Sequence, residues 1–187
     1  MIRTSGIVKL FYPAMLYRIP SDGKKTAYLT FDDGPIPEAT PLVLDILKQY
    51  NAKATFFCVG DNVKKYPQIV ERIINEGHTT GNHTYNHISG WTTPLKEYID
   101  NVDSCANVVP SVLFRPPYGR ITRRQVKYLE KKYRIVLWDV LSRDYETHLD
   151  AGSCFQIVKK YTRPGSIIVF HDSIKAKNNL QYALPRF

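Results

Sequence analysis

Short apolar runs alternate along the chain with longer segments in which apolar residues recur at helical spacing. Runs rich in β-branched and aromatic residues predict buried strands, whereas positions such as Leu42, Ile46 and Tyr50 place apolar side chains on one helix face. The pattern predicts strands over 27–31, 54–59, 78–80, 111–114, 135–138 and 166–170, and helices over 40–50, 63–74, 93–106, 122–129 and 150–161. Strands that alternate with helices indicate a mainly parallel sheet, either doubly wound or closed as a barrel.

Two of the predicted helices begin with capping signals. Thr40 followed by Pro41 fits an N-cap with a proline at the first helical position. Thr122 and Gln125 have the spacing of a capping box. We therefore expect the two helices to begin at these residues.

Polar residues follow most of the predicted strands at their carboxyl ends. In parallel α/β folds, ligands bind at these ends, so the residues are expected to share one site. They are Asp32 and Asp33 after the first strand, His83 and His87 after the third, 115–119 after the fourth, 139–144 after the fifth, and His171 with Asp172 after the last.

The adjacent acids and the histidine pair suit a catalytic metal site. Neighbouring residues on an extended chain point to opposite sides, so Asp32 and Asp33 need not share one role. His83 and His87 are four positions apart and, with one carboxylate, complete a set that suits zinc or a similar divalent ion and leaves positions open for water. The spacing does not say which acid binds the metal, and Asp-Asp-Gly-Pro also fits a solvated turn. His78 lies within a strand run and is interpreted as a packing residue.

Hydrolysis at such a site needs a base for the water and an acid for the leaving group. One of the paired acids fits the base and His171 fits the acid, although a buried histidine can also simply bond a backbone carbonyl. Arg115 can orient the base, and Asp144 or Asp139 can hold His171 in its charged state. The rigid turn that follows Arg115 can direct a backbone N–H at an oxyanion, or can be purely structural.

The composition is that of one ordinary globular domain of 187 residues. Three scattered cysteines predict reduced packing residues rather than a disulfide framework. The net charge of +9 comes from dispersed Lys and Arg, and because no nucleic-acid motif accompanies it, no nucleic-acid partner is expected. The apolar N-terminal stretch is interrupted by Lys9, Pro13 and Arg18, so neither a signal peptide nor a membrane span is expected. A cytoplasmic location is the default expectation, and an extracytoplasmic one if a targeting segment has been removed.

Four motifs together resemble the polysaccharide deacetylases, the NodB-homology domain of carbohydrate esterase family four. The resemblance covers about 25–171 and implies a distorted, incomplete (β/α) barrel, in one domain over 1–187 with its motifs at 25–172. In chain order the motifs are Thr30-Phe31-Asp32-Asp33-Gly34-Pro35, His83-Thr84-Tyr85-Asn86-His87, Arg115-Pro116-Pro117-Tyr118-Gly119 and Val169-Phe170-His171-Asp172.

The resemblance assigns a role to each matching residue. It implies that Asp32 is the general base paired with Arg115, and that His171 is the general acid. The metal ligands would be Asp33, His83 and His87. The backbone N–H of Tyr118 would stabilise the oxyanion. The residues that would line the substrate-binding site are Pro116, Pro117, Tyr145 and Val169. Asp144 and Tyr145 stand where the family usually has Asp followed by Trp, so Tyr145 leaves the substrate preference open.

These roles predict a metal-dependent enzyme that hydrolyses N-acetyl groups on a GlcNAc-containing polysaccharide or oligosaccharide. One divalent ion is expected, zinc first, with cobalt, nickel or manganese as alternatives. A deacylase of a small-molecule or lipid-linked sugar amide is a second interpretation, and a non-catalytic glycan-binding module or a basic nucleic-acid binder a third. The oligomeric state is left open.

The C-terminal element is expected to be short, because family members usually continue through a further helix and strand after the position of Pro185. The barrel would then be open at that seam or be covered by a partner. The N-terminal segment with Phe11, Tyr12, Met15 and Leu16 is a further candidate to pack there.

Overall fold

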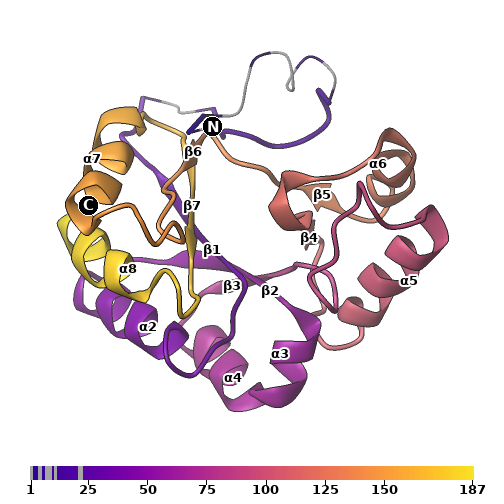
Figure 1. Cartoon of the computed structure of the whole chain (residues 1–187), viewed down its shortest axis with the longest axis horizontal. Coiled ribbons are helices and arrows are strands. Elements are labelled where there is room, and N and C mark those ends of the chain that lie inside the picture. Colours follow the sequence, from indigo (N-terminus) through magenta and orange to yellow (C-terminus); the bar gives the residue numbers. More distant parts are fainter. Residues whose placement is uncertain (1, 4–5, 7–9, 11, 21–22) are drawn as a thin grey trace.

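Parallel strands form one curled sheet that closes only part of a barrel (Figure 1). The structure is a computed structural model that describes residues 2–3, 6, 10, 12–20 and 23–187. The sheet has seven strands in the order β5-β4-β3-β2-β1-β7-β6. They are β1 (Tyr28–Asp32), β2 (Ala54–Cys58), β3 (Thr79–Asn82), β4 (Leu113–Phe114), β5 (Arg134–Ile135), β6 (Val140–Leu141) and β7 (Ile167–His171). The strands β5 and β6 remain as edges, and the predicted incomplete (β/α) barrel is confirmed.

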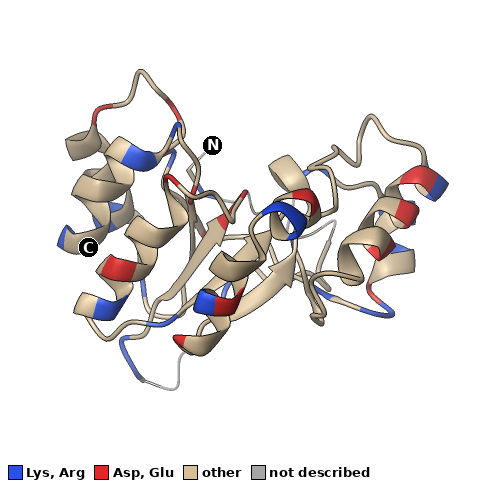
Figure 2. Ribbon diagram, turned by 90° about the horizontal axis from the view of Figure 1, so that it is seen from below, with Lys and Arg blue, Asp and Glu red and all other residues tan. Residues whose placement is uncertain are grey.

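Helices cover the outer face of the curled sheet (Figure 1). They are α2 (Thr40–Gln49), α3 (Gly60–Lys65), α4 (Pro67–Asn75), α5 (Leu95–Ala106), α6 (Arg123–Leu129), α7 (Ala151–Tyr161) and α8 (Lys177–Ala183). Lys, Arg, Asp and Glu lie on the helices and loops, and Asp32 and Arg134 are the only ones within the strands (Figure 2). In the part of the chain that is described, no helix is long and apolar enough to cross a membrane.

The strand β1 separates the hydrophobic core from the polar interior of the barrel. Phe31 points outward and stacks on Phe56 and Phe170, with ring centroids 5.1 and 5.9 Å away. Because side chains alternate along a strand, Thr30 and Asp32 point to the opposite face, into the barrel. The sequence period of β1 therefore places a carboxylate inside, at the carboxyl end of a central strand.

The prediction of a single helix over 63–74 is wrong, because two helices occupy this region. The chain breaks between α3 and α4 at Tyr66, which has φ −130° and ψ 55°. Pro67 causes the break, since proline disfavours helical geometry at the preceding residue and has no N–H to donate. In α4, Pro67 lies in the first turn, where the missing N–H costs nothing.

The two capping predictions have different outcomes. The capping box of Thr122 and Gln125 is present and confirmed. The N-cap prediction for Thr40 is wrong, since Ala39 is the N-cap and no side chain caps α2. The Thr40 hydroxyl instead accepts from the Ile36 N–H at 2.8 Å and donates to Asp172 Oδ2 at 2.6 Å.

Two elements near the C-terminus were not predicted. The strand β6 has only two residues, and the polar, fully buried Asp139 and Ser142 lie on either side of it, so no apolar run marks it. The helix α8 packs against α7 and α2 and buries Leu180 and Ala183. The short C-terminal element is thus a helix on the outer layer.

The N-terminal segment crosses the open side of the barrel between β5 and β6 (Figure 1). The Leu16 N–H donates to the Ile135 carbonyl, and the Leu137 N–H donates to the Leu16 carbonyl, both at 2.8 Å. Further along, the Ile19 N–H donates to the Gly165 carbonyl at 2.9 Å, next to β7. These bonds add an irregular strand at the seam.

The predicted packing of this segment is therefore present in the described residues. Met15 is buried, while Tyr12 and Leu16 are half-buried. Phe11, which was predicted to take part, lies outside the described residues. The cysteines also match their prediction, since Cys58, Cys105 and Cys154 are buried and unbridged.

Candidate active site

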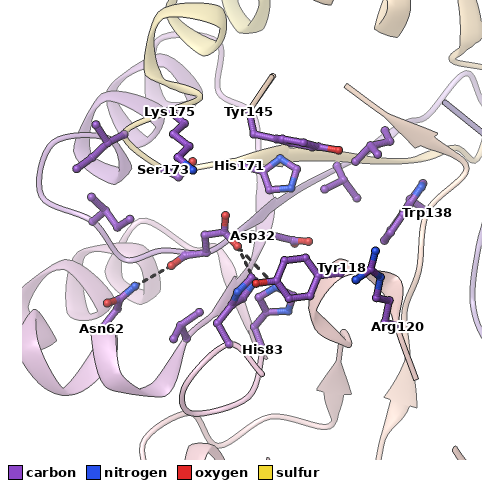
Figure 3. Close-up of a pocket in the computed structure, with 17 residues that line it drawn as sticks. Asp32, Asn62, His83, Tyr118, Arg120, Trp138, Tyr145, His171, Ser173 and Lys175 are labelled. Carbon is purple, nitrogen blue, oxygen red and sulfur yellow. Dashed lines mark hydrogen bonds and ion pairs between the residues drawn. The ribbon is translucent and has the colours of Figure 1, made fainter. Parts of the chain in front are cut away.

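A cavity of about 760 Å³ opens at the carboxyl ends of the strands, where the sequence predicts a site (Figure 3). Residues from most strand ends contribute to its wall. The lining residues are Asp32, Asp33, Ile36, Val59, Asn62, His83, His87, Tyr118, Arg120, Trp138, Leu141, Tyr145, Val169, His171, Ser173, Ile174 and Lys175.

Asp32 lies at the base of this cavity in a buried ion pair with Arg115. The Arg115 Nη1 donates to Asp32 Oδ1 at 2.6 Å and also to Thr30 Oγ1 at 2.8 Å. Arg115 is completely buried, and Asp32 is nearly so. A charge pair in this environment is held in one geometry, so Asp32 faces the cavity in a fixed orientation.

The other two guanidinium nitrogens of Arg115 also donate hydrogen bonds. Its Nε donates to the Val136 carbonyl at 3.1 Å and its Nη2 to the Leu137 carbonyl at 3.0 Å. The guanidinium lies over the Phe57 ring, 4.1 Å from the centroid. Burial lowers the pKa of Arg115 from its ordinary value, and the contact with Asp32 opposes that effect. Arg115 thus connects the segment after β5 with the end of β1.

Asp33, His83 and His87 converge as three potential metal ligands. Each residue offers one ligand atom, and these atoms lie within 4.8 Å of one another. The Nε2 atoms of His87 and His83 lie 3.1 and 3.8 Å from Asp33 Oδ1. This donor set of two imidazoles and one carboxylate fits zinc and related divalent ions.

The protonation of these groups also fits a metal. The Arg115 carbonyl can only accept, so the 2.7 Å contact places the hydrogen of His83 on Nδ1 and leaves Nε2 free to bind. Burial lowers the pKa of His83 to about 4, so the ring is neutral. Burial alone raises the pKa of Asp33, but the contact with His87 and the charge of His171 hold it well below its usual range.

The turns that carry these ligands have unusual backbone geometry. Asp33, Thr84 and His87 have φ values of 85°, 62° and 56° without being glycine. Such conformations persist where surrounding contacts fix them, often at functional sites. Asn82 Oδ1 accepts from the Thr84 N–H at 2.9 Å, and Asn62 Nδ2 donates to the Asp33 carbonyl at 2.8 Å. Sequence reasoning missed both asparagines, although Asn82 is adjacent to the histidine motif.

His171 is paired with Asp144 rather than with Asp139. The His171 Nδ1 lies 2.7 Å from Asp144 Oδ1, and the His171 backbone N–H donates to Asp144 Oδ2 at 2.7 Å. Burial alone lowers the pKa of His171, but the Asp144 carboxylate outweighs it, and the pKa rises to about 9. Asp139 instead binds Arg163 at 3.0 Å and Ser166 Oγ at 2.8 Å. Of the two acids left open by the sequence, Asp144 is the one in contact with His171.

Tyr145 and Val169 both line the cavity, as expected for substrate contacts. The Tyr145 ring packs edge-on against His171, with centroids 4.7 Å apart. Val169 belongs to β7 and is fully buried beneath the cavity surface. The aromatic wall expected at the fourth motif is thus in place beside His171 (Figure 3).

The turn after β4 brings Tyr118 to the cavity but not the two prolines before it. Tyr118 has φ 60°, and its ring packs edge-on against His87 at 4.7 Å between centroids. Pro116 and Pro117 are buried and are absent from the cavity lining, and their contact with substrate stays a prediction. Their carbonyls accept from the Gly119 and Arg120 N–H groups at 3.0 Å, so the prolines shape the turn that presents Tyr118.

Asp172 lies at this site, as the sequence predicts, but sequence reasoning gave it no role. Its Oδ1 accepts from the Gly34 N–H at 3.1 Å and its Oδ2 from the Thr40 hydroxyl at 2.6 Å. Burial raises the pKa of Asp172 to about 8, and the charge of Asp33 adds to the shift. A Cβ on Gly34 would lie 1.9 Å from Asp172 Oδ2, so only glycine fits. Asp172 thus supports the turn that carries Asp33.

Comparison with known proteins gives the same family as these motifs. A family model described as polysaccharide deacetylase matches residues 20–135. A peptidoglycan-N-acetylglucosamine deacetylase of Bacillus cereus is 41% identical over 158 residues, and the match covers 80% of this chain and 57% of that relative. A chitooligosaccharide deacetylase of Azorhizobium caulinodans is 34% identical over 160 residues, covering 81% of this chain and 76% of the relative.

A solved structure extends the similarity to the whole fold. It is the crystal structure of a peptidoglycan N-acetylglucosamine deacetylase in complex with 4-naphthalen-1-yl-N-oxidanyl-benzamide, with a TM-score of 0.86 and 34% sequence identity. The match covers 98% of this chain and 90% of that one. From its motifs, its fold and these similarities, the chain belongs to the polysaccharide deacetylase family.

Proposed function

We propose that the protein is a metal-dependent hydrolase that removes N-acetyl groups from a GlcNAc-containing glycan. The products are acetate and a glycan with a free amine. One observation supports this proposal most strongly, namely that the Asp32–Arg115 pair, the three potential ligands and the His171–Asp144 pair surround one cavity. The activities named for the similar deacetylases point to the same substrate class.

Asp33, His83 and His87 would hold the metal ion, and zinc is the first candidate, with cobalt, nickel and manganese as alternatives. A divalent ion in such a site lowers the pKa of water and polarises a carbonyl as a Lewis acid. The fixed Nδ1–H contact of His83 with the Arg115 carbonyl directs Nε2 at the site, which favours binding.

Asp32 would take the proton of the attacking water. Its Oδ1 is used by Arg115, and no hydrogen bond among the described residues engages its Oδ2. The free oxygen is therefore the atom available to the water. Because Arg115 is held from several sides, the Asp32 carboxylate keeps its orientation while the proton moves.

His171 would protonate the leaving amine. Attack of water forms a C–O bond to the acetyl carbon, and breaking the C–N bond leaves a nitrogen that needs a proton. With its pKa raised to about 9, His171 carries that proton at neutral pH. The Nδ1 contact to Asp144 leaves Nε2 as the donor. The backbone N–H of Tyr118 is the candidate donor to the developing oxyanion.

Acetate release from a panel of N-acetylated glycans and small amides tests the proposal, with metal analysis of the same sample. We expect release from GlcNAc oligomers, loss of release after chelation, and recovery on addition of zinc. Activity on small amides without activity on any glycan would instead favour a small-molecule deacylase. Bound metal without any acetate release would contradict catalysis.

A further inference from the structure

An exposed tryptophan and an arginine lie side by side at one end of the cavity. The Arg120 guanidinium lies 5.3 Å from the centroid of the Trp91 ring and 5.8 Å from that of Tyr118. Arg120 and Tyr118 line the cavity, and Trp91 is 65% exposed. Figure 3 shows Tyr118 and Arg120 at the wall of the cavity, and the contact with Arg120 places Trp91 next to this wall.

The loop that carries Trp91 is fixed to the chain around Arg120. The Gly90 N–H donates to the Arg120 carbonyl at 3.1 Å. Gln125, which is buried, donates through Nε2 to the Gly90 carbonyl at 2.9 Å and also forms the capping box of α6. A Cβ on Gly90 would approach Gln125 Oε1 to 2.5 Å and the Arg120 carbonyl to 2.6 Å, so the two segments are in close contact. Trp91 is thus held in place while its ring remains exposed.

The charge of Arg120 has no acidic partner in the described part of the chain. Other arginines, such as Arg72, Arg143 and Arg163, are each paired with a carboxylate. The aromatic rings around Arg120 orient its guanidinium without neutralising the charge. A planar guanidinium of this kind matches a carboxylate through two parallel hydrogen bonds.

We propose that Trp91 and Arg120 form a subsite for a sugar unit that neighbours the reacting residue and carries a carboxylate. The exposed Trp91 ring stacks on the apolar face of that sugar, and Arg120 binds its carboxylate. The net charge of +9 favours the approach of an anionic glycan. This inference rests on the proposed function and specifies its substrate as an acidic glycan.

Lys175 offers a comparison at the other side of the cavity. It is the second of the two Lys or Arg residues that line the cavity, and Figure 3 shows it across the site from Arg120. Arg120 makes cation–π contacts with aromatic rings, whereas Lys175 makes no such contact within the described residues. The structure therefore favours the Arg120 end for the carboxylate.

Equilibrium binding by calorimetry tests the subsite, with a chelator present so that the proposed hydrolysis does not consume the ligand. The ligands are two oligosaccharides of equal length, a neutral GlcNAc oligomer and one whose neighbouring unit carries a carboxylate. We expect the protein to bind the acidic oligomer about tenfold more tightly at low salt. Arg120→Gln should remove most of this preference, and Trp91→Ala should weaken binding of both oligomers. Lys127→Gln on α6, which removes an exposed charge outside the cavity, is the matched control and should keep the preference.

Three results would overturn the subsite. They are the absence of a preference in the unmodified protein, a preference that survives Arg120→Gln, and loss of the preference in Lys175→Gln but not in Arg120→Gln. Acetate release is measured separately on both oligomers. Release without a charge preference refutes the subsite alone, whereas an Arg120-dependent preference without release refutes the proposed hydrolysis alone.

Discussion

Arg115 Nη1 lies 2.6 Å from Asp32 Oδ1, and both side chains are buried beneath the cavity. The same guanidinium donates to the Val136 and Leu137 carbonyls, so one charged group bonds both the segment after β5 and the end of β1. Removing one partner of a buried pair leaves an uncompensated charge and costs about 3–5 kcal/mol. The contact is therefore expected to affect folding stability as well as chemistry.

Replacing Asp32 tests both effects. Asp32→Asn removes the proposed proton acceptor and should lower turnover on the order of 10²- to 10⁴-fold while leaving bound metal in place. Urea denaturation should show a loss of about 3–5 kcal/mol, because the amide leaves the buried charge of Arg115 uncompensated. Asp45→Asn, which breaks an exposed pair with Arg72, is the control and should change stability by less than about 1 kcal/mol. Full activity in Asp32→Asn would show that another group takes the proton.

The metal ligands can be tested by histidine replacement. His83→Ala should abolish zinc binding, because it removes one of the three converging donor atoms. His78→Ala is the matched control, since His78 is also buried but lies outside the cluster and bonds the Ala54 N–H at 3.3 Å. Elemental analysis after dialysis gives the zinc content of each variant. Equal zinc in the two variants would mean that the ligand set is wrong.

The Asp144–His171 pair predicts a pH effect. His171 can act as the general acid only while it is protonated. The rate of acetate release should therefore fall only as pH rises through about 9. Asp144→Asn removes the carboxylate that raises the pKa of His171. The burial that lowers this pKa remains. The alkaline limb of the kcat profile should therefore move to lower pH by more than about one unit. Asp139→Asn should leave this limb unchanged, and an unshifted limb in Asp144→Asn would remove His171 as the acid.

The same shift links pH to stability. A histidine whose pKa rises from 6.5 to about 9 on folding stabilises the native state fully below pH 6.5, and the contribution disappears as pH rises through about 9. Unfolding curves of the unmodified protein and Asp144→Asn should therefore converge above pH 9. A difference that persists there would have another cause.

Glycine at position 34 is expected to be essential for the turn that carries Asp33. In Gly34→Ala the added Cβ would lie 1.9 Å from the buried Asp172 carboxylate, so the turn or Asp172 must move. We expect a loss of about 2–4 kcal/mol and reduced metal affinity. Gly77→Ala is the comparison, because it meets only the flexible end of Lys53 and its φ of 78° costs about 1 kcal/mol. Equal losses in a thermal or urea melt would contradict the steric explanation.

Much of the site could be predicted because parallel strands bring their carboxyl ends together. Asp32 and His171 each end an apolar strand run, and His83 follows a short predicted strand, so the order of the elements places all three at one edge of the sheet. The roles of the two adjacent acids could not be separated by spacing. The family resemblance separated them, and the structure shows that Arg115 contacts Asp32 while the histidines contact Asp33.

The features that sequence reasoning missed depend on contacts between distant segments. Thr40 has the local signature of an N-cap, but the buried Asp172 takes its hydroxyl. Asp139 and Asp144 are equivalent acids by position, and their different partners, Arg163 and His171, are fixed by tertiary packing. Local propensity cannot rank such alternatives, because burial and long-range partners decide between them.

The N-terminal segment also bears on the order in which the chain can fold. Arg18 binds the Pro164 carbonyl at 2.8 Å, and these residues are 146 positions apart in the sequence. During synthesis this segment leaves the ribosome well before its partners, which follow only when the residues between them have been made. Pairs of such high sequence separation form late and slow the folding of a domain. The seam of the barrel is therefore completed late in folding, by residues that have waited for partners made much later.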